Sequence, residues 1–335
     1  MRVKRAVAVL DTHTEGEPTR IVLGGMPLLK GNSMAEKKKY FEENLRSWRT
    51  FLMREPRGHA DMFGAVITEP FHPEADLGVV FMDTSGSLNM CGHGSIGIIA
   101  SAVKLGWVDK KQEIVLESPA GLVRGRVEKE KGDTYVVSLI NVPSFLYLAD
   151  YELEVPEIGK KIRLDIAFGG NFYAIVEASQ LGLEVSNENL PQLIKFGLRI
   201  RELINEKVEV VHPEKKHIRT VELVEFSGPP SHPEATMKNV VIFGEGSVDR
   251  SPCGTGTSAR IATLYAKGRL KKGEIFVHES ITGTLFKAKV LDEVKVGEYK
   301  AIIPEITGSA WIWGFNFLVG EVEDPLFDGF LLKRV

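Results

Sequence analysis

The chain contains an internal repeat centred on its only two cysteines, and this repeat limits the possible folds more than any other feature. The first copy opens with Cys91–Ser95 and closes at Gly106, and the second opens with Cys253–Thr257 and closes at Gly268. In both copies the cysteine lies 15 residues before the closing glycine. A Gly-rich opening, an apolar run and a closing glycine predict one short buried helix in each copy, with a cysteine at its start.

The repeat extends to both sides of these helices. A β-rich segment follows each helix, at Glu113–Leu116 and at Glu274–Val277. An amphipathic helix precedes each cysteine. Its apolar face holds Phe41, Leu45, Trp48 and Leu52 in the first copy and Leu190, Ile194, Ile200 and Ile204 in the second. The sequence therefore predicts an α/β (α+β) protein with two pseudo-symmetric halves, residues 1–148 around Cys91 and residues 149–319 around Cys253.

Composition and charge exclude several classes of protein. With 335 residues, of which 43% are hydrophobic and 26% charged, the chain is long enough for two globular domains. A net charge of -3, with Lys and Arg scattered among Asp and Glu, gives no reason to expect a nucleic-acid partner. No stretch resembles a signal peptide or a membrane span, so we expect no membrane partner and a cytoplasmic protein with reduced thiols.

Two thiols in equivalent places suit the inversion of a carbon centre. Inversion at an α-carbon requires a base on one face and an acid on the other, and two cysteines can do both if one is thiolate and the other thiol. A free thiol has a pKa near 8.5, which a helix N-terminus can lower to roughly 3.5–7.5. The neighbouring glycines let the backbone approach a ligand, so that helix N–H groups can hold a carboxylate and stabilise an enolate-like intermediate.

Other interpretations of the cysteines are weaker. A single buried cysteine is usually a small hydrophobic core residue, but the repeat argues against this for both. A disulfide does not suit a reducing compartment. A zinc site with Cys91, His93 and Cys253 lacks a fourth ligand at the usual spacing. A thiol-dependent redox or ligand-binding module is the alternative from a different class, and the absence of a Cys-x-x-Cys pair argues against its redox form.

The two cysteine motifs resemble those of the proline racemase and hydroxyproline epimerase family. The matching segments are Met90–Ser95, Asp249–Ser258 and an N-terminal Asp11–Pro18, and the similarity covers essentially the whole chain. The resemblance implies the fold shared with diaminopimelate epimerase, in which each half wraps curved strands around a central helix. It also implies that a C-terminal segment, about residues 320–335, returns to the first half.

The resemblance also implies roles for single residues. Cys91 and Cys253 are the expected acid and base. The backbone N–H groups of Gly92, His93, Gly254 and Thr255 are expected to hold the substrate carboxylate, and Asp249 and the His93 side chain to contact its amine. For Asp249, the alternative is a loop-capping side chain in Ser247–Arg250. The expected reaction needs no cofactor and no metal.

The expected substrate is proline, with 4-hydroxyproline as a second substrate. The family's proline pocket is lined by phenylalanines, and Phe63, Phe81 and Phe243 fall at the corresponding places, although each could be a core residue. Glu225 lies in a segment similar to one in 4-hydroxyproline epimerases, where a polar group meets the ring hydroxyl; its alternative is a surface carboxylate. The family's trans-3-hydroxyproline dehydratases typically replace the first cysteine, so the presence of Cys91 disfavours that branch. A dedicated 4-hydroxyproline 2-epimerase, a racemase of another amino acid and a non-catalytic ligand-binding protein remain alternatives. We expect a homodimer.

Overall fold

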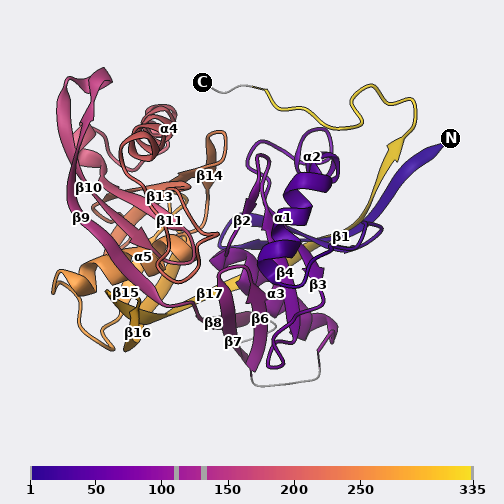
Figure 1. The fold of residues 1–335 in the computed structure, drawn as a ribbon, viewed down its shortest axis with the longest axis horizontal. Coiled ribbons are helices and arrows are strands. Elements are labelled where there is room, and N and C mark those ends of the chain that lie inside the picture. The colour runs from indigo at the N-terminus through magenta and orange to yellow at the C-terminus, as the bar shows by residue number, and fades with distance from the viewer. Residues whose placement is uncertain (1, 109–112, 130–133, 333–335) are drawn as a thin grey trace. The chain divides into compact units, whose positions relative to one another are not determined.

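The computed structural model describes residues 2–108, 113–129 and 134–332, and these form two compact units (Figure 1). Unit 1 holds residues 2–138 and 309–332, and unit 2 holds residues 139–308. Each unit has one curved sheet and one buried helix that opens at a cysteine. The predicted fold class is therefore confirmed: two α/β halves, each with curved strands around a central helix.

The sheet of unit 1 has the strand order β17–β1–β2–β3–β4–β6–β7. The β2–β3 and β4–β6 pairs are parallel and the others are antiparallel. The strands are β1 (Val3–Thr14), β2 (Glu17–Gly24), β3 (Gly64–Thr68), β4 (Leu77–Met82), β5 (Ser87–Leu88), β6 (Glu113–Ser118), β7 (Gly121–Lys129) and β8 (Tyr135–Ile140), with the C-terminal part of β17 (Tyr299–Glu321).

The sheet of unit 2 repeats this order, as β9–β10–β11–β12–β13–β15–β16, with β11–β12 and β13–β15 as the parallel pairs. The N-terminal part of β17 pairs with both β16 and β9, so this sheet closes on itself. Its strands are β9 (Ser144–Val155), β10 (Lys160–Phe168), β11 (Phe172–Glu177), β12 (Leu223–Gly228), β13 (Met237–Phe243), β14 (Ser247–Asp249), β15 (Phe276–Glu279) and β16 (Leu285–Val296).

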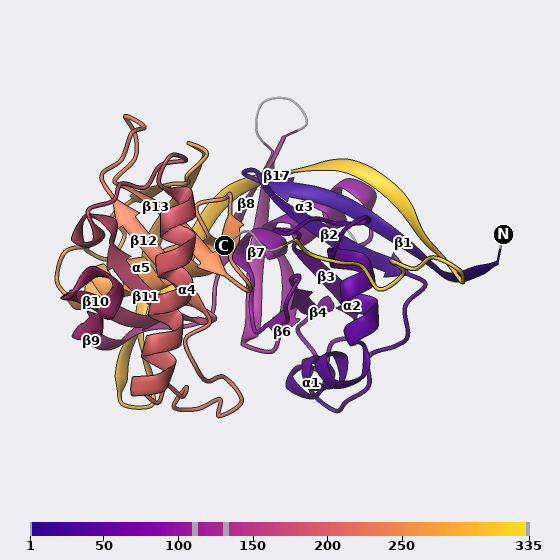
Figure 2. The same cartoon turned by 90° about the horizontal axis from the view of Figure 1, so that it is seen from above.

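The central helices are α3 (Gly92–Leu105) in unit 1 and α5 (Gly254–Ala266) in unit 2. The first eleven residues of each are buried. Both helices end as predicted, because Gly106 and Gly268 adopt the left-handed conformation that ends a helix at low cost. In unit 2, α4 (Leu190–Lys207) packs on the outside of β12 and β13 (Figure 2). Two short 3-10 helices, η1 (Pro156–Ile158) and η2 (Ala178–Leu181), complete that unit.

The single helix predicted around residues 41–52 is instead two helices, α1 (Met34–Asn44) and α2 (Arg46–Met53). Asn44 donates a side-chain hydrogen bond to the Tyr40 carbonyl at 3.1 Å, an interaction that competes with helix continuation. Leu45 lies between the helices with a non-helical backbone. The predicted apolar face is nevertheless correct, since its residues pack into one buried cluster of unit 1.

The repeat extends further than the cysteine motifs. Each unit carries a His-Pro-Glu-Ala turn, at His72–Ala75 and at His232–Ala235. In unit 1 the carboxylate of Glu117 accepts the N–H groups of Phe71 and His72, and in unit 2 Glu279 accepts those of Ser231 and His232. Matching turns with matching carboxylate partners show that the two units share detailed loop structure as well as strand order.

The C-terminal part of the chain lies along the first strand of unit 1. Residues 310–321 of β17 pair antiparallel with β1 over its length. Residues 333–335 of the segment expected to return to the first half lie outside the described residues. No helix in the described ranges is long and apolar enough to cross a membrane.

Candidate active site

Cys91 is the N-cap of α3. Its backbone is extended, with φ −143° and ψ 123°, and its Sγ accepts a hydrogen bond from the Gly94 N–H at 3.2 Å. The first N–H groups of a helix have no partner inside the helix, and the helix dipole there favours negative charge. The Gly94 N–H and the helix dipole are therefore available to a negative charge on the Cys91 sulfur.

His93, in the first turn of α3, lies beside this thiol. Its Nδ1 is 3.3 Å and its Nε2 3.5 Å from the Cys91 Sγ. Its ring contacts the Phe63 ring edge-on, with the two ring centroids 4.6 Å apart. The ring centroids of Phe63 and Phe81 are 6.2 Å apart. Unit 1 thus brings together four predicted site residues: a thiol, an imidazole and two phenyl rings.

The hairpin between β1 and β2 supports this end of α3. Glu15 and Gly16 both have positive φ, as a two-residue type I′ turn requires. Thr14, just before the turn, donates its hydroxyl to the His93 carbonyl at 2.8 Å. Further along the hairpin, buried Asp11 and Arg20 form an ion pair with 2.8 Å between Oδ1 and Nε. The Asp11–Pro18 motif therefore supports the helix that carries Cys91.

Cys253 is the N-cap of α5, but its backbone differs from that of Cys91. Its φ is +62° and its ψ 103°, in a region that residues other than glycine rarely adopt. Its N–H donates to the Ser251 hydroxyl at 3.1 Å. Backbone strain of this kind is concentrated at functional sites.

Tyr173, on β11, is a site residue that the sequence reasoning missed. Its hydroxyl is 3.3 Å from the Cys253 Sγ and 2.5 Å from the Thr255 Oγ1. Burial raises its pKa well above the usual tyrosine value, as does the nearby thiol, so it is a neutral hydroxyl at physiological pH. Tyr173 follows the Gly169–Asn171 turn between β10 and β11, and no motif around it identifies it from sequence.

The pKa of the Cys253 thiol lies well above its usual value. Burial is the main cause, and the negative charges of Asp249 and Glu225 add to it. Hydrogen bonds from Tyr173 and from the Gly256 N–H oppose the rise. The protonated form of Cys253 is therefore favoured in the absence of a ligand.

Asp249 organises the loop that leads into α5. Its Oδ1 accepts hydrogen bonds from the Ser251 N–H and the Ser251 hydroxyl, both at 2.8 Å. The loop-capping role considered from sequence is therefore present. Asp249 lies opposite Val241 in the β13–β14 pair, and Phe243 lies opposite Ser247 in the same pair. Unit 2 thus places Phe243 and Asp249 on adjacent strands.

Glu225, on β12, is fully buried, so its interpretation as a surface carboxylate is wrong. Its Oε1 accepts from the Ser227 hydroxyl at 3.4 Å and lies 4.0 Å from the Nε2 of buried His278. Burial raises the pKa of Glu225 to about 7 and lowers that of His278 to about 3. His278 is therefore neutral, and Glu225 titrates near neutral pH.

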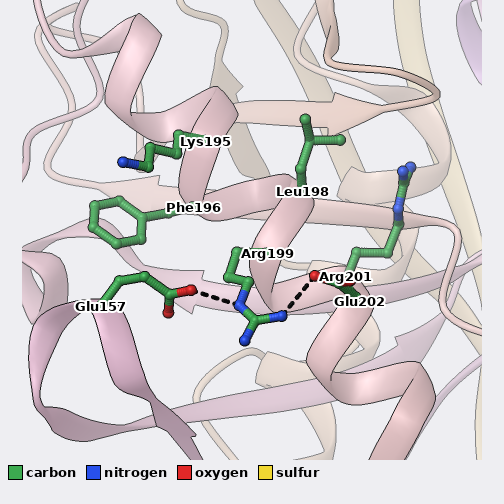
Figure 3. A pocket seen from close by; sticks show the side chains of 7 residues that line it. All are labelled: Glu157, Lys195, Phe196, Leu198, Arg199, Arg201 and Glu202. Carbon is green, nitrogen blue, oxygen red and sulfur yellow. Dashed lines mark hydrogen bonds and ion pairs between the residues drawn. The ribbon is translucent and has the colours of Figure 1, made fainter. Parts of the chain in front are cut away.

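Two other features bear on what this structure can bind. Among the described residues, no three His, Cys, Asp or Glu side chains are grouped so that they could hold a metal ion. A cavity of about 480 Å³ beside α4 is lined by none of the predicted site residues (Figure 3). Arg199 in this cavity is held by Glu157 and Glu202, with both N–O distances 2.6 Å.

Known proteins of similar sequence match along the whole chain. A family model described as "Proline racemase" matches residues 9–331. The proline racemase of Acetoanaerobium sticklandii is 57% identical over 333 residues, covering 98% of this chain and 99% of that protein. That of Clostridioides difficile is 54% identical over 336 residues, covering 99% and 100%. The trans-3-hydroxy-L-proline dehydratase of Bacillus cereus is 43% identical over 335 residues, also covering 99% and 100%.

Solved structures of similar fold include proteins related to this family. A hydroxyproline epimerase from Agrobacterium vitis, with bound trans-4-hydroxy-L-proline, has a TM-score of 0.93 at 33% identity, covering 100% of this chain and 98% of that chain. A Bacillus anthracis phenazine biosynthesis protein of the PhzF family has a TM-score of 0.61 at 13% identity, covering 93% and 98%, which supports the diaminopimelate epimerase-like fold alone. From the family match and the identity along its whole length, this chain belongs to the proline racemase family.

Proposed function

We propose that this isomerase interconverts the enantiomers of proline by a two-base mechanism in which Cys91 and Cys253 act on opposite faces of the α-carbon. One observation carries the proposal. The only two cysteines of the chain form no disulfide, and each is the N-cap of the central helix of its unit. A duplicated thiol at a duplicated helix end supplies two groups of the same chemistry, as inversion requires.

The proton balance of the reaction is simple. A thiolate on one face takes the α-proton and becomes a thiol. The thiol on the other face gives its proton to the same carbon and becomes a thiolate. The number of protons on the enzyme is unchanged after one turnover. The cysteine that began as the thiolate is now the thiol, and the other cysteine is now the thiolate. Reaction in the opposite direction uses the same two groups with their roles exchanged.

The substrate carboxylate is the group that the helix ends are suited to bind. The N–H groups of Gly92 and His93 at the start of α3, and of Gly254 and Thr255 at the start of α5, are the first of their helices. Such groups bind anions through hydrogen bonds and the helix dipole. As the α-proton leaves, negative charge moves onto the carboxylate oxygens, and the same donors stabilise it.

Asp249 and the His93 side chain are the proposed partners of the substrate ammonium. Both are nearly fully buried, at 4% exposed, so a cation beside Asp249 would be only weakly screened. Phe63, Phe81 and Phe243 are the proposed walls of the ring pocket, and the edge-on contact between Phe63 and His93 supports a place for Phe63 beside the thiol. The buried position of Glu225 behind Gly256 favours a role toward Cys253 over contact with a ring hydroxyl.

Proline is the proposed main substrate and trans-4-hydroxy-L-proline the second. Two proline racemases are 54% and 57% identical to this chain, and a structural neighbour is a hydroxyproline epimerase with trans-4-hydroxy-L-proline bound. Cys91 and Cys253 are both present, which favours racemisation over the dehydration named for the Bacillus cereus relative. Because neither cysteine forms a disulfide, we assign the enzyme to the reducing cytoplasm, and the proposed chemistry requires no cofactor.

A homodimer is part of the proposal. On β17, Trp313, Phe315, Phe317 and Val319 alternate along one face and are 57%, 61%, 79% and 41% exposed. A continuous apolar patch of this kind on a sheet is typical of an interface with a second copy. Sedimentation of the parent at twice the monomer mass, and of Phe315→Lys/Phe317→Lys at the monomer mass, is expected. A monomeric parent would contradict the assignment.

Polarimetry tests the activity directly. Purified protein incubated with L-proline, and separately with D-proline, is expected to approach zero rotation from both sides with no added cofactor. Trans-4-hydroxy-L-proline is expected to approach a mixture with its 2-epimer. Release of water from trans-3-hydroxy-L-proline, with no change in the rotation of proline, would instead identify a dehydratase.

A further inference from the structure

The strand register of the two units aligns Glu225 with an alanine. In unit 1, Ala65 of β3 lies opposite Phe81 of β4. In unit 2, Glu225 of β12 lies opposite Val241 of β13. The two strand pairs hold the same place in their sheets, each with its His-Pro-Glu-Ala turn at the same end. Ala65 and Phe81 of unit 1 therefore correspond to Glu225 and Val241 of unit 2.

Further positions of unit 2 are polar where the equivalent positions of unit 1 are apolar. Leu77 pairs with Leu116 in unit 1, and the equivalent Met237 pairs with His278 in unit 2. Val79 lies opposite Ile67, and the equivalent Asn239 lies opposite Ser227. The residues that replace Ala65, Val79 and Leu116 are thus Glu225, Asn239 and His278, all fully buried. A concerted change of this kind beneath one helix points to a function rather than to packing.

The positions that differ between the two units lie directly behind the first turn of each central helix. A Cβ added to Gly94 would lie 2.8 Å from the Phe81 ring and 3.1 Å from the Cys91 Sγ. A Cβ added to Gly256 would lie 2.6 Å from the Glu225 Oε2 and 3.1 Å from the Cys253 Sγ. Glu225 Oε2 and Cys253 Sγ are therefore at most about 6 Å apart, close enough for one charge to affect the ionisation of the other.

Burial raises the pKa of the Glu225 carboxyl group to about 7, while Arg260, Asn239 and Ser227 act to lower it, so the group is a carboxylate above that pH. Its Oε2 has no hydrogen-bond partner, and the same holds for Asn239 Oδ1 and His278 Nε2 among the described residues. The charged or titratable groups that face it are Cys253 and Arg260 from α5, Glu177 from β11 and His278 from β15. Arg260 is engaged with the Glu177 carboxylate at 2.5 Å, and His278 is neutral.

We propose that Glu225 is a positioning residue that acts through Cys253: its carboxylate, behind Gly256, keeps Cys253 as the thiol in the resting enzyme, so that Cys91 is the resting thiolate. This assignment rests on the proposed two-thiol function. It deepens that function by making the two cysteines unequal before substrate binds. The free enzyme is then poised for the enantiomer whose α-proton faces Cys91.

Asp249 raises the pKa of Cys253 more than Glu225 does. The two carboxylates differ, however, in what happens to them when substrate binds. The substrate ammonium neutralises Asp249 when it binds there, whereas it does not reach Glu225, which lies behind Gly256 of the helix. Cys91 differs from Cys253 in its side-chain neighbour: the Gly94 N–H donates to its sulfur, as the Gly256 N–H does to that of Cys253, but a His93 ring nitrogen lies 3.3 Å away. Hydrogen bonds to the charged form favour the thiolate.

Alkylation of each cysteine by iodoacetamide, which requires no turnover, tests the proposal. The reagent is uncharged and both thiols are 4% exposed, so their reactivities can be compared directly. Quantitative mass spectrometry of the two cysteine peptides gives the alkylation rate of each against pH. In the parent, Cys91 is expected to react at lower pH than Cys253. In Glu225→Gln, the midpoint for Cys253 is expected to fall by roughly one pH unit or more, while that for Cys91 does not move.

A control variant and a folding measurement distinguish a specific effect of Glu225 on Cys253 from a general effect of the substitution. Glu152→Gln makes the same change at a half-exposed position on β9 and is expected to move neither midpoint. Thermal unfolding shows whether Glu225→Gln is folded, and the order of the two cysteines in the parent is a test that needs no variant. A parent in which Cys253 reacts first, or a folded Glu225→Gln with an unmoved Cys253 midpoint, overturns the proposal. Loss of the proposed function shows separately, as a parent that leaves the rotation of L-proline unchanged.

Discussion

The Tyr173 hydroxyl lies 3.3 Å from the Cys253 Sγ, and it is the side-chain donor best placed to stabilise that sulfur as a thiolate. When Cys253 has given up its proton, the hydroxyl can donate to it, and Thr255 Oγ1, 2.5 Å from the same hydroxyl, holds it in place. Hydrogen bonds to charged groups contribute about 1.5–3 kcal/mol. The pair therefore lowers the cost of the buried negative charge that each turnover places on Cys253.

Tyr173→Phe is accordingly expected to reduce kcat about 10- to 100-fold in both directions, because this hydrogen bond is stronger in the charged state. Steady-state polarimetry with L- and D-proline measures the loss. Tyr147→Phe, which removes a hydroxyl on β9 that donates to the Glu209 carbonyl at 3.3 Å, is the matched control. A Tyr173→Phe enzyme within twofold of the parent would mean that Tyr173 contributes packing alone.

The close space behind both thiols gives a second prediction. Gly256→Ala places a methyl group 2.6 Å from Glu225 and 3.1 Å from the Cys253 Sγ, and Gly94→Ala places one 2.8 Å from Phe81 and 3.1 Å from the Cys91 Sγ. Overpacking of this kind costs about 1–3 kcal/mol, and a displaced catalytic atom costs about 100-fold in rate. Both variants are expected to lose activity and melting temperature. Gly86→Ala, with nothing within 4 Å of the new methyl group, is expected to lose neither.

Acid stability provides a third prediction. Burial alone would raise the pKa of Glu279, but hydrogen bonds from His232 and Ser231 lower it to about 2 from an ordinary value of 4.5. The native carboxylate therefore contributes stability above pH 4.5, and this contribution is lost as the pH falls toward 2. Urea unfolding between pH 6 and 3 is expected to show a smaller pH dependence for Glu279→Gln than for the parent. Equal slopes would show that Glu279 has an ordinary pKa in the native state.

The ring pocket gives a fourth prediction. If Phe63 and Phe243 form an apolar wall for the pyrrolidine ring, then replacing either with serine should reduce kcat/KM for proline more than for trans-4-hydroxy-L-proline, whose hydroxyl tolerates a polar wall. The ratio of the two kcat/KM values is the measurement. Equal losses for the two substrates would identify these residues as general packing, which their burial also allows.

The sequence predicted what depends on local pattern. The Gly-rich turns, apolar runs and closing glycines of the repeat are local signals, and they identified α3, α5 and the capping position of both cysteines. Trp48 and Leu52 were assigned to the correct face, but the side-chain interaction of Asn44 that ends α1 is not visible in hydrophobic periodicity. Contacts between distant strands leave no local signal, so sequence reasoning missed Tyr173.

The burial of Glu225 is a second feature that the sequence pattern could not predict. Its burial depends on the pairing of β12 with β13 and on the glycine above it, and these relationships emerge only from strand register. A carboxylate near a strand end is usually exposed, so composition and pattern favour the wrong interpretation. Aligning the two units by register, rather than by motif alone, is what distinguishes Glu225 from its counterpart Ala65.

Single replacement of each cysteine tests the central claim most directly. Both directions of racemisation use both thiols, so Cys91→Ser and Cys253→Ser are each expected to abolish L-to-D and D-to-L conversion alike. A positioned acid or base contributes about 10²- to 10⁴-fold, and serine is a far weaker acid than cysteine, so losses near the upper end are expected. The double variant is expected to lose little more, because groups that act as a unit are not additive. Polarimetry showing either single variant within about tenfold of the parent in either direction would contradict the two-thiol mechanism.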